Sequence, residues 1–385
     1  MTTRSVLSTI LVSALVACGG SSSADTDTDT EAGSGSSTGG SSATQSSATQ
    51  SSATQSSAAA TTAEPTTGTN TLGDSSTTSD EDAGSSTTGD DGPLVDPRTE
   101  GEHEVELIEV DIETKGGTNI PLTMYVPTSE GPHPVVIFLQ GFLLGPDNYA
   151  SYGEHIGSWG YVVIMPELPG STQSGDRDAT SELIDWVEGP GTLEGAVLGG
   201  RADPELLLLG GHSRGGKVSF LTATTDTRVD AVFGIDPVDT AGGPGTNPSP
   251  DNPSVAPELM PLVLAPMTIV GETVNATGGF MSCAPEAENF RQYFGAATAP
   301  AAAIEFVTAN HMSFLDDPNC GFTCSACPAG TDEPSVTRRM TQGYMVAFAQ
   351  WQLRGQDGYR DYLAGPFTQP DIDAGLVTVD TLNGY

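Results

Sequence analysis

Basic residues are scarce in this chain. Lysine and arginine together number 13, against 50 aspartates and glutamates in 385 residues, which gives a formal net charge of −37. A chain this acidic repels the phosphate backbone of nucleic acids and other anionic surfaces. We therefore exclude nucleic acid as a partner.

Large apolar side chains are absent from a long segment in the first fifth of the chain. None occurs between residues 19 and 70, a segment rich in Ser, Thr, Gly, Ala and Gln in which the unit SSATQ repeats from Ser41 onward. Such a segment cannot bury enough surface to offset the entropy lost on ordering, and a period of five fits neither helix nor strand. Residues 19–95 are therefore predicted to be a disordered linker, and residues 96–385 to form one folded domain.

No apolar run at the N-terminus is long enough to span a bilayer. Arg4 precedes a short apolar stretch, residues 6–16, which ends in Leu15-Val16-Ala17-Cys18. Small residues directly before a cysteine resemble the lipobox of a bacterial lipoprotein signal, and the alternative is an ordinary secretory signal. The resemblance implies that residues 1–18 are a signal peptide and that Cys18 carries a lipid anchor in a membrane. It further implies export to the outer membrane or the cell surface.

Cysteine is also scarce, with five residues including Cys18. An even number of remaining cysteines in an exported protein predicts two disulfides, and four cysteines allow three pairings. These residues are Cys283, Cys320, Cys324 and Cys327. A zinc site with four cysteine ligands is the alternative, and the CxxxCxxC spacing also resembles an iron–sulfur motif. Asp316 and Asp317 could ligate a cation, but a solvated acidic loop is the preferred interpretation, and we expect no metal and no cofactor.

Short apolar runs bounded by proline or glycine recur through the folded part. Continuous apolar strands are typical of a parallel sheet that is covered on both faces. The runs are residues 134–139, 161–165, 206–209, 231–235, 267–270 and 304–307. Two earlier segments, 104–112 and 120–126, alternate apolar and polar residues and are predicted to pair as a hairpin.

Helical patterns lie between these runs. They cover residues 148–159, 180–187 and 217–224, and residues 336–353 form a last long amphipathic pattern. Because strands and helices alternate, the sequence predicts an α/β fold with a mostly parallel central sheet and helices on both faces.

The glycine-rich turn Gly211-His212-Ser213-Arg214-Gly215 follows an apolar strand and precedes a helix. The G-x-S-x-G pattern in this context predicts the nucleophile elbow of an α/β-hydrolase, with Ser213 as nucleophile. We expect glycine to be required at positions 211 and 215, because side chains there would collide with neighbouring elements. His212 is adjacent to Ser213 in sequence, so its side chain points elsewhere and it is not the base.

The base follows by elimination. In this fold the acid and then the histidine come after the serine, and His311 is the only one of the five histidines that follows Ser213. The acid is predicted to be Asp236, at the end of the apolar run 231–235. Glu272 is the alternative acid and Asp239 a weaker third choice.

The oxyanion hole of such an enzyme needs two backbone N–H groups. One is predicted to come from Arg214, the residue after the nucleophile. The other is predicted to come from Phe142, in the loop that follows the run 134–139.

The segments VVIFLQGFLLG, GHSRGGK, GIDPVD, CAPEAENFRQYF and HMSFLDD occur in this order across residues 135–317. They resemble chlorophyllases and the related bacterial esterases, a group near the cutinase-like and platelet-activating-factor acetylhydrolase-like enzymes. The resemblance implies an α/β-hydrolase fold and ester chemistry for residues 96–385. In chlorophyllases the acid lies in the DPV segment, which supports Asp236. Gln140 departs from the family, which usually has His before this Gly.

The predicted activity is hydrolysis of carboxylic esters through an acyl-enzyme on Ser213. The apolar Phe142-Leu143-Leu144 favours an apolar or lipid-like ester as the small-molecule partner, and we expect a monomer. The alternatives are a non-catalytic surface binding lipoprotein on a hydrolase scaffold, chlorophyllase-type dephytylating activity, and a peptidase of the same fold. Residues 171–204 and 240–262 are insertions long enough to form a lid.

Overall fold

The computed structural model describes residues 94–385 apart from 194, 242–245 and 278–281. The expected signal peptide with Cys18, and the expected linker up to residue 93, lie outside the described residues. Among the helices that are described, none combines the length and the apolar character needed to cross a bilayer.

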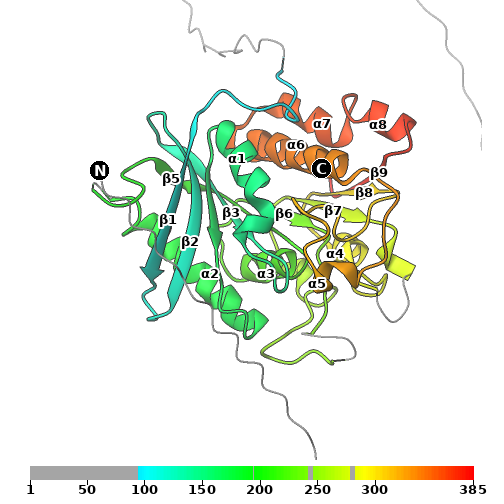
Figure 1. Ribbon diagram of the computed structural model, residues 1–385, viewed down its shortest axis with the longest axis horizontal. Coiled ribbons are helices and arrows are strands. Elements are labelled where there is room, and N and C mark those ends of the chain that lie inside the picture. The colour runs from blue at the N-terminus through cyan, green and yellow to red at the C-terminus, as the bar shows by residue number, and fades with distance from the viewer. Residues whose placement is uncertain (1–93, 194, 242–245, 278–281) are drawn as a thin grey trace, which may run out of the picture. The chain divides into compact units, whose positions relative to one another are not determined.

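One nine-stranded sheet forms the centre of the described domain (Figure 1). The strands are β1 (Val105–Glu113), β2 (Asn119–Pro127), β3 (His133–Leu139), β4 (Val162–Pro166), β5 (Ala202–His212), β6 (Ala231–Ile235), β7 (Met267–Glu272), β8 (Ala301–Phe306) and β9 (Val377–Leu382). Their order in the sheet is β1-β2-β4-β3-β5-β6-β7-β8-β9. The six strands from β4 to β8 in this order are mutually parallel, while β2 and β9 run antiparallel to their neighbours.

Helices cover both faces of this sheet, as the sequence predicts. The helices are α1 (Ala150–Ser158), α2 (Gln173–Glu188), α3 (Arg214–Ala223), α4 (Phe290–Ala296), α5 (Phe322–Ser325), α6 (Pro334–Arg354), α7 (Asp361–Ala364) and α8 (Gln369–Asp373). Successive strand residues point to opposite faces. Along β3, Val136 and Phe138 join the apolar cluster of α1 and α6, and Val135 and Ile137 join that of α2 and α3. Figure 1 shows these two helix layers on either side of the sheet.

All eight strands predicted from the sequence are present, with altered bounds. The largest difference is at β5, which extends the predicted run 206–209 to Ala202–His212. The strand β9 and the short helices α4, α5, α7 and α8 have no counterpart among the elements predicted from the sequence. The strand β9 lies at the edge of the sheet and its side chains are mostly partly or fully exposed. It therefore lacks the apolar run that identified the central strands.

The insertion at residues 171–204 contributes a helix to the body of the domain. It contains α2, whose Leu183 and Ile184 are buried in the core. The described part of residues 240–262 packs at the start of this helix, where Ser174 N–H donates to the carbonyl oxygen of Asp251 across 2.9 Å.

The four cysteines in the described residues form two disulfides, Cys283–Cys327 and Cys320–Cys324. The predicted pairing of these cysteines in disulfides is therefore confirmed, and the structure adds the connectivity. Sulfur atoms paired in this way are not thiolate ligands, which argues against the four-cysteine zinc site and the iron–sulfur interpretation. The first bridge joins segments 44 residues apart, and the second joins residues four positions apart.

The two bridges are expected to differ in their effect on stability. A cross-link reduces the entropy of the unfolded chain more when it closes a longer loop. Replacing Cys283 and Cys327 by serine should lower the free energy of unfolding by about 4 kcal/mol, and replacing Cys320 and Cys324 by about 2 kcal/mol. Urea unfolding of the two double variants measures this, and an equal or reversed order would contradict the expectation.

Candidate active site

Ser213 lies at the sharp turn between β5 and α3. Its φ of 56° and ψ of −119° are rare for a residue with a side chain and cost about 1–3 kcal/mol. The turn is sharp because main chain packs against main chain here. A Cβ atom at Gly211 would lie 2.4 Å from the carbonyl oxygen of Leu139, and one at Gly215 would lie 2.1 Å from it. Both elbow positions therefore require glycine.

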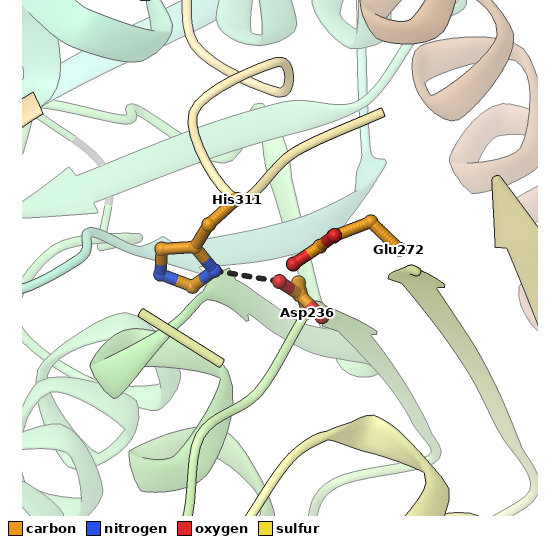
Figure 2. Close-up of side chains that lie close together, drawn as sticks. All are labelled: Asp236, Glu272 and His311. Carbon is orange, nitrogen blue, oxygen red and sulfur yellow. Dashed lines mark hydrogen bonds and ion pairs between the residues drawn. The ribbon is translucent and has the colours of Figure 1, made fainter. Parts of the chain in front are cut away.

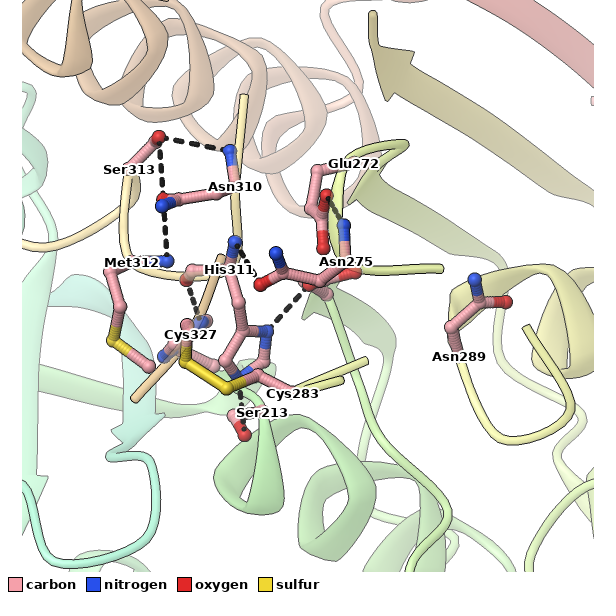
Figure 3. Close-up of polar contacts among 12 residues, drawn as sticks. Ser213, Glu272, Asn275, Cys283, Asn289, Asn310, His311, Met312, Ser313 and Cys327 are labelled. Carbon is pink, nitrogen blue, oxygen red and sulfur yellow. Dashed lines mark hydrogen bonds and ion pairs between the residues drawn. A yellow bond between two sulfur atoms is a disulfide. The ribbon is translucent and has the colours of Figure 1, made fainter. Parts of the chain in front are cut away.

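Ser213, His311 and Asp236 form one hydrogen-bonded line. The Ser213 hydroxyl donates to Nε2 of His311 across 2.8 Å (Figure 3), and Nδ1–H of His311 donates to Oδ2 of Asp236 across 2.6 Å (Figure 2). The three residues follow β5, β8 and β6, so the carboxyl ends of parallel strands deliver them to one edge of the sheet. His311 and Asp236 are buried, whereas Ser213 is partly exposed.

The two other candidate acids occupy different positions. Glu272 ends β7 and lies beside Asp236, where its Oε2 accepts the N–H of Asn275 across 2.9 Å (Figures 2 and 3). Asp239 instead pairs with Nζ of the buried Lys217 at 2.9 Å and accepts backbone N–H groups of the following loop. Of the three candidates, Asp236 is the carboxyl that receives the N–H of His311.

Asp236, Glu272 and His311 also form a cluster of possible metal ligands, since one ligand atom of each lies within 4.8 Å of the others. Ligand atoms around a tetrahedral zinc ion lie about 3.3 Å apart or more. Nδ1 of His311 and Oδ2 of Asp236 are only 2.6 Å apart. This separation fits a shared proton, so the donor set does not favour a metal.

Burial is the main influence on the charges of this cluster. It lowers the pKa of His311 to about 4, so that the imidazole is neutral at neutral pH and able to accept a proton. Burial, and next the charge of Asp236, raise the pKa of Glu272 to about 8, which leaves that carboxyl protonated. Burial also raises the pKa of Asp236. Because the N–H of His311 donates to Asp236, the negative charge of the carboxyl pair is best placed there.

Asn275 holds the loop that carries His311 (Figure 3). Its Oδ1 accepts the backbone N–H of His311 across 3.1 Å, and its Nδ2 donates to the carbonyl oxygen of Pro328 across 3.1 Å. Its own N–H donates to Glu272. The Cys283–Cys327 bridge closes beside these contacts, which ties the segment after β7 to the segment after β8.

Of the two predicted oxyanion-hole residues, Arg214 belongs to the elbow and Phe142 belongs to the loop that follows β3. Arg214 is the first residue of α3, and the N–H groups of a first helical turn have no acceptor within the helix. In the sheet Leu139 pairs with Gly211, so the loop that begins at residue 140 starts beside the elbow. The N–H of Gly141 donates to Oη of Tyr149 across 3.2 Å and is therefore occupied. Phe142 is the next residue along this loop.

The same loop exposes apolar side chains beside the elbow. Phe142 is 55% exposed and Leu143 is 75% exposed. Leu143 also has a φ of 59°, a left-handed conformation that a leucine adopts only at a cost in free energy. The loop that starts beside the elbow therefore carries a leucine that is both strained and exposed.

Sequence reasoning missed the polar residues that support the site. Asn275 and Tyr149 lie in two short 3-10 helices, Asn275–Thr277 and Pro146–Tyr149, which have no sequence motif of their own. His212 was excluded as the base, and in the structure it bonds Tyr149 and the carbonyl oxygen of His311. The one sequence feature that could have indicated this supporting role is the histidine itself, which stands between Gly211 and Ser213 in the elbow.

The raised pKa of Glu272 predicts a pH-dependent stability. Its ordinary pKa is 4.5, so between pH 4.5 and about 8 the folded protein binds the proton that the unfolded chain has released. This stabilisation is complete at low pH and is lost as the pH rises through the folded pKa. The variant Glu272→Gln lacks this titrating group. Between pH 6 and pH 8 the free energy of unfolding of the variant should therefore fall by about 2 kcal/mol less than that of the unaltered protein.

Urea unfolding at the two pH values measures the difference. Glu109→Gln, which makes the same substitution at an exposed position of β1, is the matched control and should behave like the unaltered protein. If Glu272→Gln shows the same pH dependence as Glu109→Gln, Glu272 is not the protonated carboxyl.

Comparison with known proteins identifies the family of this chain. The family model described as chlorophyllase matches residues 96–371. Chlorophyllase-2 of Arabidopsis thaliana is 30% identical over 254 residues, which cover 61% of this chain and 78% of that protein. Chlorophyllase-1, chloroplastic, of Citrus unshiu is 27% identical over 263 residues, covering 65% of this chain and 78% of that protein. The chain therefore belongs to the chlorophyllase family of α/β-hydrolases.

Proposed function

We propose that this protein is a serine esterase, in which Ser213 is the nucleophile, His311 the base and Asp236 the acid. The observation that carries the proposal is the hydrogen-bonded line from Ser213 through His311 to Asp236, with bonds of 2.8 and 2.6 Å. A serine hydroxyl is a weak nucleophile without such a base, and the base needs an orienting carboxylate. The alternative hypothesis, a non-catalytic binding protein, does not explain why these three side chains are aligned at a strained elbow.

The proposed reaction has two steps. His311 Nε2 takes the proton of Ser213 Oγ while the oxygen attacks the ester carbonyl carbon, and the N–H groups of Phe142 and Arg214 stabilise the oxyanion. The bond to the leaving oxygen breaks as His311 returns the proton to the alcohol. Water then attacks the acyl-enzyme with the same help from His311, which releases the carboxylic acid and restores Ser213. Asp236 keeps the imidazole in the tautomer with Nδ1–H throughout.

The proposed substrate is an apolar or lipid-like ester. The exposed Phe142 and Leu143 beside the nucleophile support an apolar acyl or alcohol group. Dephytylation of chlorophyll is the second candidate, favoured by the similarity to chlorophyllases over residues 96–371. We further propose that a lipid anchor at Cys18 holds an exported, monomeric enzyme at the outer membrane or cell surface, with the linker as spacer.

Hydrolysis of p-nitrophenyl esters from acetate to palmitate tests the esterase. The unaltered protein should hydrolyse the series, and Ser213→Ala should lose at least about 10³-fold in kcat because the covalent step is gone. Chlorophyll, assayed in parallel, decides between the two substrate candidates. Ser219→Ala, which removes a buried hydroxyl of the same helix, is the control and should retain activity. A folded protein without activity on any of these esters, and without labelling of Ser213 by a phosphonate, would contradict the proposal.

Leu143 offers a test of the apolar contact that is separate from the catalytic residues. Leu143→Gly removes the side chain and relieves the left-handed strain, so stability should stay equal or rise by up to about 1 kcal/mol. KM for long-chain esters should rise by about five- to tenfold, while KM for acetate changes little.

The matched control is Leu264→Gly. Leu264 is 77% exposed and precedes β7. It therefore lies near the amino ends of the parallel strands, whereas Ser213 lies at their carboxyl ends. This variant should lower stability by about 0.5–1 kcal/mol through backbone entropy and leave both KM values unchanged. An equal effect of the two variants on long-chain esters would refute a role of Leu143 in substrate binding.

A further inference from the structure

His212 is a buried titratable residue that the proposed mechanism does not use. It is fully buried, between the loop that follows β3 and the loop that follows β8. Its ring lies 4.6 Å from the ring of His311, centroid to centroid, and 5.8 Å from that of Tyr149. The side chain is thus inserted between the oxyanion loop (residues 140–145) and the base loop (residues 307–316).

A chain of hydrogen bonds runs through His212 from one loop to the other. The N–H of Gly141 contacts Oη of Tyr149 at 3.2 Å, and this oxygen contacts Nδ1 of His212 at 2.8 Å. On the other side of the ring, Nε2 of His212 contacts the carbonyl oxygen of His311 at 3.0 Å. All four groups are buried, so water does not replace these bonds.

The two ends of this chain determine the direction of every bond. The N–H of Gly141 can only donate, and the carbonyl oxygen of His311 can only accept. Nε2 of His212 must therefore carry the hydrogen, and a neutral ring then leaves Nδ1 as an acceptor for the hydroxyl of Tyr149. The titratable groups that face His212 are Tyr149 and His311, and burial lowers the pKa of His212 well below its ordinary value. Every polar atom of the chain is satisfied by this one arrangement.

We propose that neutral His212 is a positioning residue that couples the oxyanion loop to the base loop through Tyr149, and this inference rests on the proposed esterase function. The two ends of this series of hydrogen bonds are backbone atoms of the oxyanion loop and of the base loop. The relative position of these loops determines catalysis in the proposed reaction. At one end it occupies the N–H of Gly141, so that the next amide, that of Phe142, is left for the oxyanion. At the other end it anchors the backbone of His311, whose side chain must stay 2.8 Å from Ser213.

Close packing at Gly141 supports this role. A Cβ atom there would lie 3.1 Å from Oη of Tyr149 and 3.2 Å from Nδ1 of His212. The loop backbone at Gly141 thus packs directly against the hydrogen-bonded pair. A histidine that merely filled the core would need neither this contact nor a bond to the catalytic histidine's carbonyl.

Two substitutions break the chain while keeping the rings. Tyr149→Phe removes the central hydroxyl, and His212→Phe removes both ring nitrogens. In the full-length protein each should lower kcat by roughly 10- to 100-fold with KM changed less than about twofold, because displaced catalytic groups affect the transition state. The double variant should be little worse than the worse single variant, since both interrupt one chain.

Tyr385→Phe is the control, because Tyr385 is buried and its hydroxyl shares a 2.6 Å bond with Thr268 away from the elbow. Rates are expressed per Ser213 labelled by a phosphonate, which removes any misfolded fraction. If Tyr149→Phe matches Tyr385→Phe in kcat, or if the two effects multiply in the double variant, the coupling is refuted. An unaltered protein without esterase activity would contradict the proposed function instead.

A second measurement does not depend on activity. Nitrogen NMR of histidine-labelled protein, with the His212 signal assigned from the spectrum of His212→Phe, reports tautomer and charge. The proposal requires Nε2–H and no titration between pH 5 and pH 8, and Tyr149→Phe should shift the Nδ1 signal. A His212 that titrates in this range, or that carries its hydrogen on Nδ1, overturns the inference.

Discussion

The contact on which the site depends is the approach of β3 to the turn between β5 and α3. The carbonyl oxygen of Leu139 lies where a Cβ atom of Gly211 or Gly215 would be. No side chain separates the two strands there, so the loop after β3 begins directly beside Ser213. This one close contact produces both the strained serine and the neighbouring amide that the proposed oxyanion hole needs. Neither loop could be displaced without separating main-chain atoms that are packed against each other.

The dry surroundings of this turn determine how charge is held. Two carboxyls and an imidazole share a small buried volume, and water cannot solvate them. A proton on Glu272 reduces the buried charge to that of Asp236, which faces the N–H of His311. When His311 accepts a proton in the proposed reaction, the imidazolium forms next to this single negative charge. The cluster then carries no net charge at the moment when the oxyanion develops, which avoids the cost of a buried unpaired ion.

The sequence predicted the parts of this arrangement that leave a pattern. Apolar runs identified the central strands, and the glycines around Ser213 identified the elbow with its strand and helix. Chain order after the serine selected His311, and the choice between Asp236 and Glu272 stayed open because both end neighbouring strands of the parallel sheet. Their roles are separated by the side-chain positions alone. Asn275 and Tyr149 could not be predicted, because each is hydrogen-bonded to the backbone of another loop. Such contacts produce no periodic pattern or fixed spacing in the sequence.

Family membership indicates the chemistry of the proposed reaction more directly than it indicates the substrate. The chemistry of the proposed reaction uses backbone N–H groups and three side chains that lie at strand ends, and these depend on the fold. The proposed substrate, in contrast, would contact exposed side chains such as Phe142 and Leu143, which are not part of the core packing. Leu143 keeps an unfavourable backbone conformation with most of its side chain in water, so its position is not explained by stability. For the proposed esterase, we therefore expect the loop after β3 to determine substrate specificity, while the proposed chemistry takes place at the elbow that this loop adjoins.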